Sequence, residues 1–130
     1  MLVVDPLAVR DLFHRAFAIA GDRLSCGHFH DTRGLGMANV FAAWQAGATR
    51  FDACLAGIGG CPHAPGASGN VATEDVAYLF ASMGVPTGQD VDKLVALRAK
   101  VAAPGRSRNS VPESRRWYSE PRGRRFSAVP

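Results

Sequence analysis

The sequence predicts an α/β fold in which parallel strands are connected by helices. Segments of helical and strand-like periodicity alternate along the chain, and this alternation is typical of parallel strands with helical crossovers. A length of 130 residues fits one domain, and 47% hydrophobic with 20% charged residues fits a soluble globular protein. Two parallel strands are too few for a sheet that is covered on both faces. We therefore expect the chain to form part of a larger α/β structure.

The first predicted helix spans residues 5–20. Asp5 can cap its N-terminus, and Pro6 suits the first helical position. The apolar residues that recur at helical spacing form one face, and they are Val9, Leu12, Phe13, Ala16 and Phe17. This face predicts an amphipathic helix that packs on a core.

A strand, a helix and a second strand follow. Residues 24–30 are short and apolar, which predicts a buried strand, although Gly27 weakens it. Residues 37–46 are predicted to form a helix that ends near a glycine. Residues 50–56 predict the second strand.

Two further helices follow a long glycine-rich loop. Thr73 precedes two acids and an apolar run, so it is the predicted N-cap of a helix over residues 74–83. Residues 89–103 predict a last helix, whose inner face is expected to consist of Val91, Leu94, Val95, Leu97 and Val101.

Residues 104–130 differ in composition from the rest. They hold seven Arg and two Glu, whereas residues 1–103 hold eight Lys or Arg and nine Asp or Glu. The sequence pI of about 9.4 is therefore a property of the tail. Without periodicity, this Arg/Pro-rich segment is expected to be a disordered tail beside a single domain over residues 1–103. Its aromatic residues could stack on RNA bases, but a solvated tail is the simpler interpretation, and no nucleic-acid partner is expected.

Composition also bears on the compartment. No apolar run approaches 18 residues, so no membrane-spanning helix and no membrane partner are expected. The first ten residues include Asp5 and Pro6 and have no basic start, which argues against a secretory signal. Three cysteines in 130 residues do not form a disulfide framework. These features predict a reducing, cytoplasm-like compartment.

Two histidines at the end of the first predicted strand are the first candidate for chemistry. Side chains alternate across a strand, so His28 and His30 share one face and Phe29 takes the other. Two adjacent imidazoles can bind one divalent metal ion. Packed or exposed histidines without a ligand are the alternative. His14, alone on a helix, is interpreted as a surface residue.

The loop after the second strand is the second candidate. Gly57, Gly59 and Gly60 permit positive φ or a close approach of the backbone to a ligand. Cys61, held in this loop, is a candidate acid, base or nucleophile. A flexible loop with an incidental thiol is the alternative. The other two cysteines, Cys26 and Cys54, lie within strand patterns and are interpreted as small core residues.

Polar residues near the third helix have simple interpretations and one functional alternative. Asn70 suits a helix entry, but its amide oxygen could also bind a hard metal ion. Glu74 and Asp75 are expected to favour the helix dipole as first-turn acids. Asp31 is expected to cap the turn after the histidines.

Together these motifs resemble the 3-hydroxy-3-methylglutaryl-CoA lyase family. The motifs are HFHDTRG at 28–34, AN at 38–39, AGIGGCP at 56–62 and GASGNVATED at 66–75. The resemblance extends over residues 5–103. The glycine–cysteine loop and the GASGN–ATED segment are specific to this family, whereas the two histidines and the following aspartate are shared with a wider superfamily of metal-dependent aldolases, carboxyltransferases and synthases.

The resemblance implies a (β/α)₈ TIM barrel with its site at the carboxyl ends of the strands. The chain would be the C-terminal, incomplete portion of that barrel. His28, His30 and Asn70 would bind Mg²⁺ or Mn²⁺, and Cys61 would be the catalytic cysteine in a mobile loop. The implied substrate is an acyl-CoA thioester, 3-hydroxy-3-methylglutaryl-CoA, cleaved to acetyl-CoA and acetoacetate. The expected location is cytoplasmic, or the mitochondrial matrix in a eukaryote, and a complete barrel could be a homo-oligomer.

The chain also departs from the family pattern. The family's first strand supplies an Arg–Asp pair, and no such strand is present here; Asp22 and Arg23 form a reversed pair in a loop. His63 replaces the usual tyrosine, and the chain departs wholly after residue 103. We therefore expect little or no activity from these 130 residues alone. A lyase for a longer branched 3-hydroxyglutaryl-CoA thioester, or a non-catalytic remnant, are the alternatives.

Overall fold

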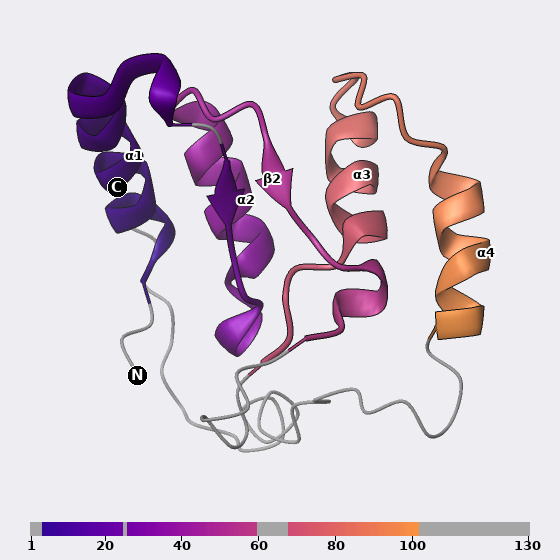
Figure 1. Cartoon of the computed structure of the whole chain (residues 1–130). Coiled ribbons are helices and arrows are strands. Elements are labelled where there is room, and N and C mark those ends of the chain that lie inside the picture. The colour runs from indigo at the N-terminus through magenta and orange to yellow at the C-terminus, as the bar shows by residue number, and fades with distance from the viewer. Residues whose placement is uncertain (1–3, 25, 60–67, 102–130) are drawn as a thin grey trace, which may run out of the picture.

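The computed structural model describes residues 4–24, 26–59 and 68–101 (Figure 1). Within these ranges the elements are α1 (Pro6–Ala20), β1 (Gly27–His28), α2 (Gly36–Gln45), β2 (Phe51–Asp52), α3 (Thr73–Ser82) and α4 (Val91–Val101), with the 3₁₀ turns η1 (Gly21–Arg23), η2 (Thr32–Gly34) and η3 (Leu55–Gly57). The predicted order of helices and strands is therefore confirmed. Most of the glycine-rich loop and the whole predicted tail lie outside the described residues.

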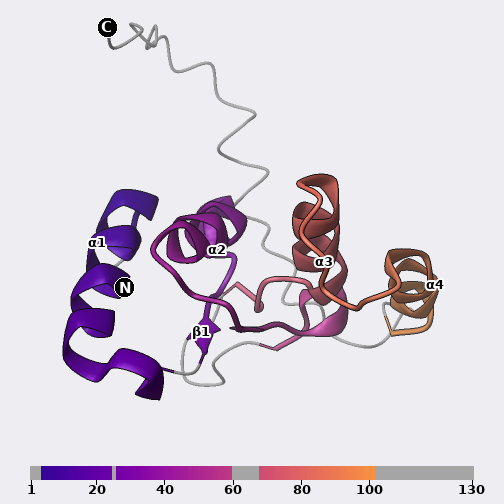
Figure 2. The same cartoon turned by 90° about the horizontal axis from the view of Figure 1, so that it is seen from above.

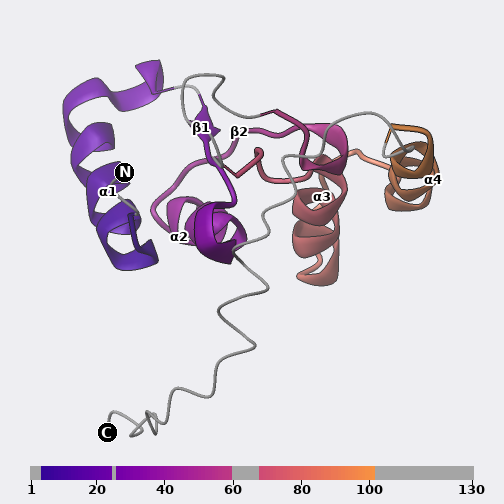
Figure 3. The same cartoon turned by 90° about the horizontal axis from the view of Figure 1, so that it is seen from below.

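The helices stand side by side, with the two strands on one side of the row (Figures 2 and 3). The strands are parallel, as predicted, with Gly27 opposite Phe51 and His28 opposite Asp52. The amide of Gly27 also donates to the carbonyl oxygen of Arg50 at 3.0 Å. Because parallel strands need a crossover, α2 connects them across one face of the sheet.

The strands are shorter than the predicted ranges 24–30 and 50–56. Each strand has only two residues. Beyond the strands along the chain, single bridges join His30 to Asn70 and Cys54 to Ala72. A strand continues only as far as a neighbouring strand pairs with it, and within the described residues each strand has only one strand neighbour. The segment around residue 70 bridges to the chain beyond the carboxyl ends of β1 and β2.

One predicted helix cap is confirmed and one is wrong. Asp5 caps α1, since its Oδ1 accepts from the amide of Ala8 at 2.9 Å and Pro6 occupies the first helical position. In α3 the capping position is Ala72, which offers no side-chain acceptor, and Thr73 lies inside the helix. The α3 start is instead connected to the β2 segment, because Thr73 donates its amide to the carbonyl of Cys54 at 3.1 Å.

The core has two clusters with α2 between them. One lies between α1 and α2 and consists of Val9, Ala42, Ala43 and Ala48, with Phe13 and Phe17 against it. The other lies between α2 and α3 and consists of Val40, Val71, Val76 and Phe80, with Trp44 against it. Phe29 and Phe51, which point to the helix side of the strands, contact both clusters. Alternation along the strands therefore leaves the neighbours of these phenylalanines on the other face.

Several residues that were predicted to be buried are exposed. Leu12 on α1 is 57% exposed, and Val95 and Leu97 on α4 are 53% and 46% exposed. Cys26 is exposed rather than part of the core. Within the described residues, α4 contacts mainly α3 and η3, and Val95 and Leu97 on it stay exposed. None of the helices in the described part of the chain is long and apolar enough to cross a membrane.

Candidate metal centre

The two histidines at the end of β1 share one face. Phe29 between them packs into the core, with its ring centroid 5.9 Å from that of Phe13 and 6.4 Å from that of Phe51. The rings of His28 and His30 lie on the opposite face with their centroids 5.3 Å apart. Burial of the phenylalanine therefore positions both imidazoles at the carboxyl ends of the strands, as alternation predicted.

The orientation of His30 is determined by the segment that bridges to it. Its Nδ1 lies 2.9 Å from the carbonyl oxygen of Ser68, a buried residue. A carbonyl oxygen can only accept, so Nδ1 is the donor, and Nε2 is the ring nitrogen that a neutral imidazole would offer to a metal ion. Two backbone bonds hold the same bridge, from Asp31 to Gly69 at 2.9 Å and from Val71 to Phe29 at 3.1 Å.

Asn70 lies opposite His30 across this bridge. Its Nδ2 donates to the carbonyl oxygen of Ile58 at 3.1 Å and to Cys54 Sγ at 3.0 Å. Because a carbonyl cannot donate, the contact with Ile58 assigns nitrogen and oxygen in the amide. Oδ1 is buried and has no hydrogen-bond partner among the described residues. A buried acceptor without a partner is costly, which is consistent with a ligand position.

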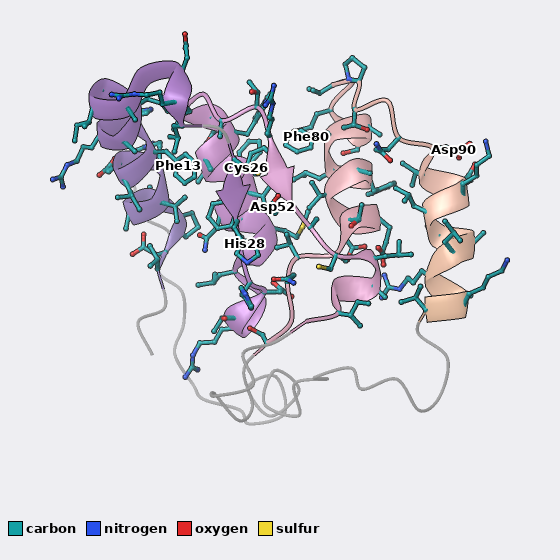
Figure 4. All side chains as sticks on the ribbon, in the orientation of Figure 1. Phe13, Cys26, His28, Asp52, Phe80 and Asp90 are labelled. Carbon is teal, nitrogen blue, oxygen red and sulfur yellow. The ribbon has the colours of Figure 1, made fainter. Side chains whose placement is uncertain are left out.

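Asp52, a residue that sequence reasoning missed, lies beside His28. Figure 4 shows Cys26, His28 and Asp52 close together on the strands. Asp52 Oδ2 is 3.7 Å from His28 Nδ1, within ion-pair distance, and Oδ1 is 3.2 Å from Cys26 Sγ. Partial desolvation and then the carboxylate of Asp52 raise the pKa of the Cys26 thiol, although the residue is exposed overall. The sequence feature that could have indicated a functional role for Asp52 is its charge within an otherwise apolar strand pattern.

The start of the glycine loop approaches Asn70 closely. Gly57 and Gly59 have φ of 63° and 109°, in the left-handed region that favours glycine. A Cβ on Gly59 would lie 2.7 Å from Asn70 Nδ2, and one on Gly57 would lie 3.0 Å from the Asn70 carbonyl oxygen. Both glycines are thus needed for the local backbone. Gly60 and Cys61 lie outside the described residues, so their predicted roles stay predictions.

Both acids lie in the first turn of α3, as expected. Glu74 has a further role, because it is 2% exposed and its carboxylate accepts from the amide of Ala56 at 3.0 and 3.1 Å. Arg98 Nη1 from α4 lies 3.0 Å from the same carboxylate. Asp75 is exposed, yet desolvation raises its pKa more than Arg98 lowers it. No local pattern distinguishes these two adjacent acids.

Asp31 connects the histidine segment to the start of α2. It occupies the N-cap position of the turn η2, but its side chain makes no capping hydrogen bond there, so the expected side-chain cap of this turn is wrong. Its Oδ1 instead accepts from the amide of Gly36, the first residue of α2, at 3.0 Å. Thr32 Oγ1 is 2.7 Å from Ser68 Oγ, which adds a side-chain contact to the backbone bridge.

The donor set fits a divalent metal ion that accepts mixed nitrogen and oxygen ligands. Two imidazoles share a face near the carboxyl ends of β1 and β2, and Asn70, whose Oδ1 has no hydrogen-bond partner among the described residues, is paired with one of them across a backbone bridge. Among the described residues, no group of three His, Cys, Asp or Glu could hold a metal ion. Residues His28, His30 and Asn70 would therefore need further ligands from water, substrate or other parts of the protein.

Comparisons with known proteins find relatives that match part of this chain. A (R)-citramalyl-CoA lyase from Chloroflexus aurantiacus is 59% identical over 69 residues, which are 53% of this chain and 22% of that protein. A hydroxymethylglutaryl-CoA lyase from Pseudomonas mevalonii is 51% identical over 77 residues, which are 59% of this chain and 26% of that protein. The chain spans about a quarter of the length of these relatives.

Solved structures agree. An HMG-CoA lyase from Acinetobacter baumannii, in complex with coenzyme A and 3-methylmalate, superposes with a TM-score of 0.73 at 38% identity, over 98% of this chain and 40% of that one. The structural neighbours are TIM barrels, so the predicted fold, part of a (β/α)₈ barrel, is confirmed. A family model described as HMGL-like matches residues 3–101, and the chain therefore belongs to the HMGL-like family.

Proposed function

We propose that this chain carries the C-terminal part of a metal-dependent lyase site that cleaves 3-hydroxy-3-methylglutaryl-CoA to acetyl-CoA and acetoacetate. The observation that carries the proposal is the buried Oδ1 of Asn70, which has no hydrogen-bond partner among the described residues, on a residue bridged to His30, whose ring shares a face with that of His28. The hydroxymethylglutaryl-CoA lyases among the relatives and solved structures support the substrate class.

The proposed ligands are His28, His30 and Asn70, and the ion is Mg²⁺ or Mn²⁺. Such an ion would supply Lewis acidity that lowers the pKa of the substrate C3 hydroxyl and orients the thioester carbonyl. Contacts within this chain orient the proposed ligands before any ion binds. Ser68 directs His30 Nε2 away from the backbone, and Ile58 directs Asn70 Oδ1 away from the loop. Fixed ligands lose little entropy on binding.

The proposed reaction is a retro-Claisen cleavage. A base removes the C3 hydroxyl proton, the C3–O bond becomes a carbonyl, and the C2–C3 bond breaks. Its electron pair passes to C2, which gives the enolate of acetyl-CoA and free acetoacetate. Cys61 donates its thiol proton to C2 and completes acetyl-CoA. Gly57 and Gly59, both at positive φ, provide a loop backbone that can approach the ligands and exclude water.

A second candidate substrate is citramalyl-CoA, which the Chloroflexus aurantiacus relative at 59% identity favours. A longer branched 3-hydroxyglutaryl-CoA thioester is a third, since a Pseudomonas aeruginosa relative at 46% identity is named a 3-hydroxy-3-isohexenylglutaryl-CoA/hydroxymethylglutaryl-CoA lyase. All three substrates have a hydroxyl on the carbon that leaves the acetyl-CoA unit. The same proposed ligands and Cys61 would serve each of them.

The test is thioester cleavage with Mg²⁺ by this chain joined to the N-terminal part of the Pseudomonas aeruginosa lyase, which has the same fold. We expect acetoacetate from 3-hydroxy-3-methylglutaryl-CoA. His28→Ala and His30→Ala should lose both Mn²⁺ binding and turnover, whereas His14→Ala, an exposed change on α1, should lose neither. Cys61→Ala should keep Mn²⁺ binding and lose turnover. Turnover by the His30→Ala chimera equal to that of the parent would refute the proposed site.

A further inference from the structure

The largest fully buried side chain among the described residues is an acid. Glu74, at the start of α3, is 2% exposed, larger than the other fully buried residues Val40 and Val71. Glutamate is almost never fully buried unless it is paired. The reaction proposed above does not use this carboxylate, so its burial needs another reason.

Glu74 joins two segments that are distant in sequence. Arg98 Nη1 on α4 lies 3.0 Å from Oε1, and the amide of Ala56 donates to both carboxylate oxygens. The neighbouring Asp75 is 3.6 Å from the same guanidinium, but its side chain is 57% exposed. Glu74 is therefore the residue that connects α4 to η3, while Asp75 is a peripheral contact.

The amide that Glu74 holds belongs to a strained residue. Ala56 has φ of 58° and ψ of 16°, the left-handed region that residues other than glycine rarely adopt. Such conformations persist where the surrounding structure imposes them. A carboxylate with a full charge is a strong acceptor for a backbone amide, and here it holds the turn η3 in this conformation.

The strained turn at Ala56 also orients Asn70, the candidate metal ligand. Two residues after Ala56, the carbonyl of Ile58 accepts from Asn70 Nδ2 at 3.1 Å. This bond directs Asn70 Oδ1 away from the loop, where it is buried without a partner among the described residues. The contacts therefore form one series: Arg98, Glu74, Ala56, Ile58 and Asn70.

We infer that Glu74 is a positioning residue for Asn70, acting through the left-handed turn at Ala56, with Arg98 of α4 as its counter-ion. The ligand role of Asn70 rests on the function proposed above, but the orientation of its amide does not. A buried ion pair adds little to stability by itself, so the pair is better explained by the geometry that it imposes.

The test compares Glu74→Gln with Val76→Ala in the isotope-labelled 130-residue chain. Glutamine keeps the size but has one acceptor oxygen in place of two and no charge to pair with Arg98. Val76 is buried on the same helix in the cluster between α2 and α3, so its truncation is a control for lost stability. We expect Glu74→Gln to shift the side-chain NH₂ resonances of Asn70 in this chain without metal, and to weaken Mn²⁺ binding by about tenfold or more in the chimera with the N-terminal part of the Pseudomonas aeruginosa lyase. Val76→Ala should change neither.

A rescue separates positioning from simple structural support. Glycine adopts a φ of 58° readily, so Ala56→Gly should return the Asn70 resonances of Glu74→Gln toward those of the parent. Should Glu74→Gln fail to fold, Arg98→Met perturbs the same series from its exposed end. Unshifted Asn70 resonances in a folded Glu74→Gln or Arg98→Met chain would overturn the inference. Shifted resonances together with a chimera, joined to the N-terminal part of the Pseudomonas aeruginosa lyase, that binds no Mn²⁺ would support the inference and refute the proposed metal site.

Discussion

Replacing Gly36 with alanine tests how tightly the ligand segments are packed. Gly36 is buried at the first turn of α2, and its amide is bound to Asp31. A Cβ at this position would lie 2.6 Å from Val71 Cγ1 and 2.9 Å from Asp31 Cα. Asp31 follows His30 and Val71 follows Asn70. The new methyl group therefore pushes on the neighbours of two candidate ligands.

Two effects of opposite sign decide the outcome. Alanine in a helix is favoured over glycine by about 1 kcal/mol. Carbon atoms pack at about 3.5–4.0 Å, so Val71 must retreat by about 1 Å, and overpacking of a core costs about 1–3 kcal/mol. The backbone of Asp31 has no rotamer with which to yield, which places the cost at the upper end. We expect a net loss of about 1–2 kcal/mol in the free energy of unfolding.

Urea unfolding followed by circular dichroism measures this loss, and Mn²⁺ titration measures its effect on the ligands. Gly84→Ala is the control, because nothing lies within 4 Å of its added Cβ and only its φ of 73° is unfavourable. Val71→Ala removes one clash, so Gly36→Ala should cost less in that background. A Gly36→Ala chain that is as stable as the parent and binds Mn²⁺ equally well would refute the reasoning.

Three further outcomes are expected. Phe80→Ala should lower the free energy of unfolding by about 3–5 kcal/mol, because Phe80 is 5% exposed and its ring stacks on that of Phe51 with the centroids 5.7 Å apart. Urea unfolding checks this, and a loss below about 1 kcal/mol contradicts it. Asp75→Asn should raise the Tm slightly at pH 7 but should not change it below about pH 4. Desolvation raises the pKa of Asp75 in the folded chain, so the carboxyl makes stability fall as the pH rises through its folded pKa. A lower Tm of Asp75→Asn at pH 7 would disprove this. Asp90→Ala should unwind the first turn of α4, since Asp90 Oδ1 accepts from the amide of Lys93 at 3.0 Å; amide exchange at Lys93 checks it. Because this hydrogen bond lowers the pKa of Asp90, the protection should be present at neutral pH and be lost as the pH falls through the lowered pKa. A protection factor at Lys93, corrected for intrinsic exchange, that stays constant with pH would contradict this.

Local patterns predicted the helices well. Asp5 and Pro6 predicted the start of α1, and the predicted ranges 37–46 and 74–83 differ by one residue at each end from α2 and α3. Caps and apolar periods act within one or two turns of the chain, so they can be read without knowledge of the rest. The strands were predicted too long, because the length of a ladder depends on neighbours that no local pattern describes.

The candidate site was predictable only in part. Alternation along the strand put His28 and His30 on one face, and the structure brings Asn70 opposite His30. Cys26 was predicted in the core but is exposed beside Asp52, because the face of the strand to which it belongs has no covering element among the described residues. Its burial depends on a partner rather than on its own hydrophobicity.

The order of amino acids thus sufficed for the helices, for the parallel strands and for the shared face of the two imidazoles. It did not suffice to predict the burial of Glu74, because the neighbouring Asp75 has the same charge and lies in the same helical turn. Only the folded chain brings Arg98 and the amide of Ala56, which lie 24 and 18 residues away along the chain, to the same carboxylate. Periodicity and capping are short-range effects, whereas the burial of a charge depends on counter-charges and donors that tertiary contacts alone assemble.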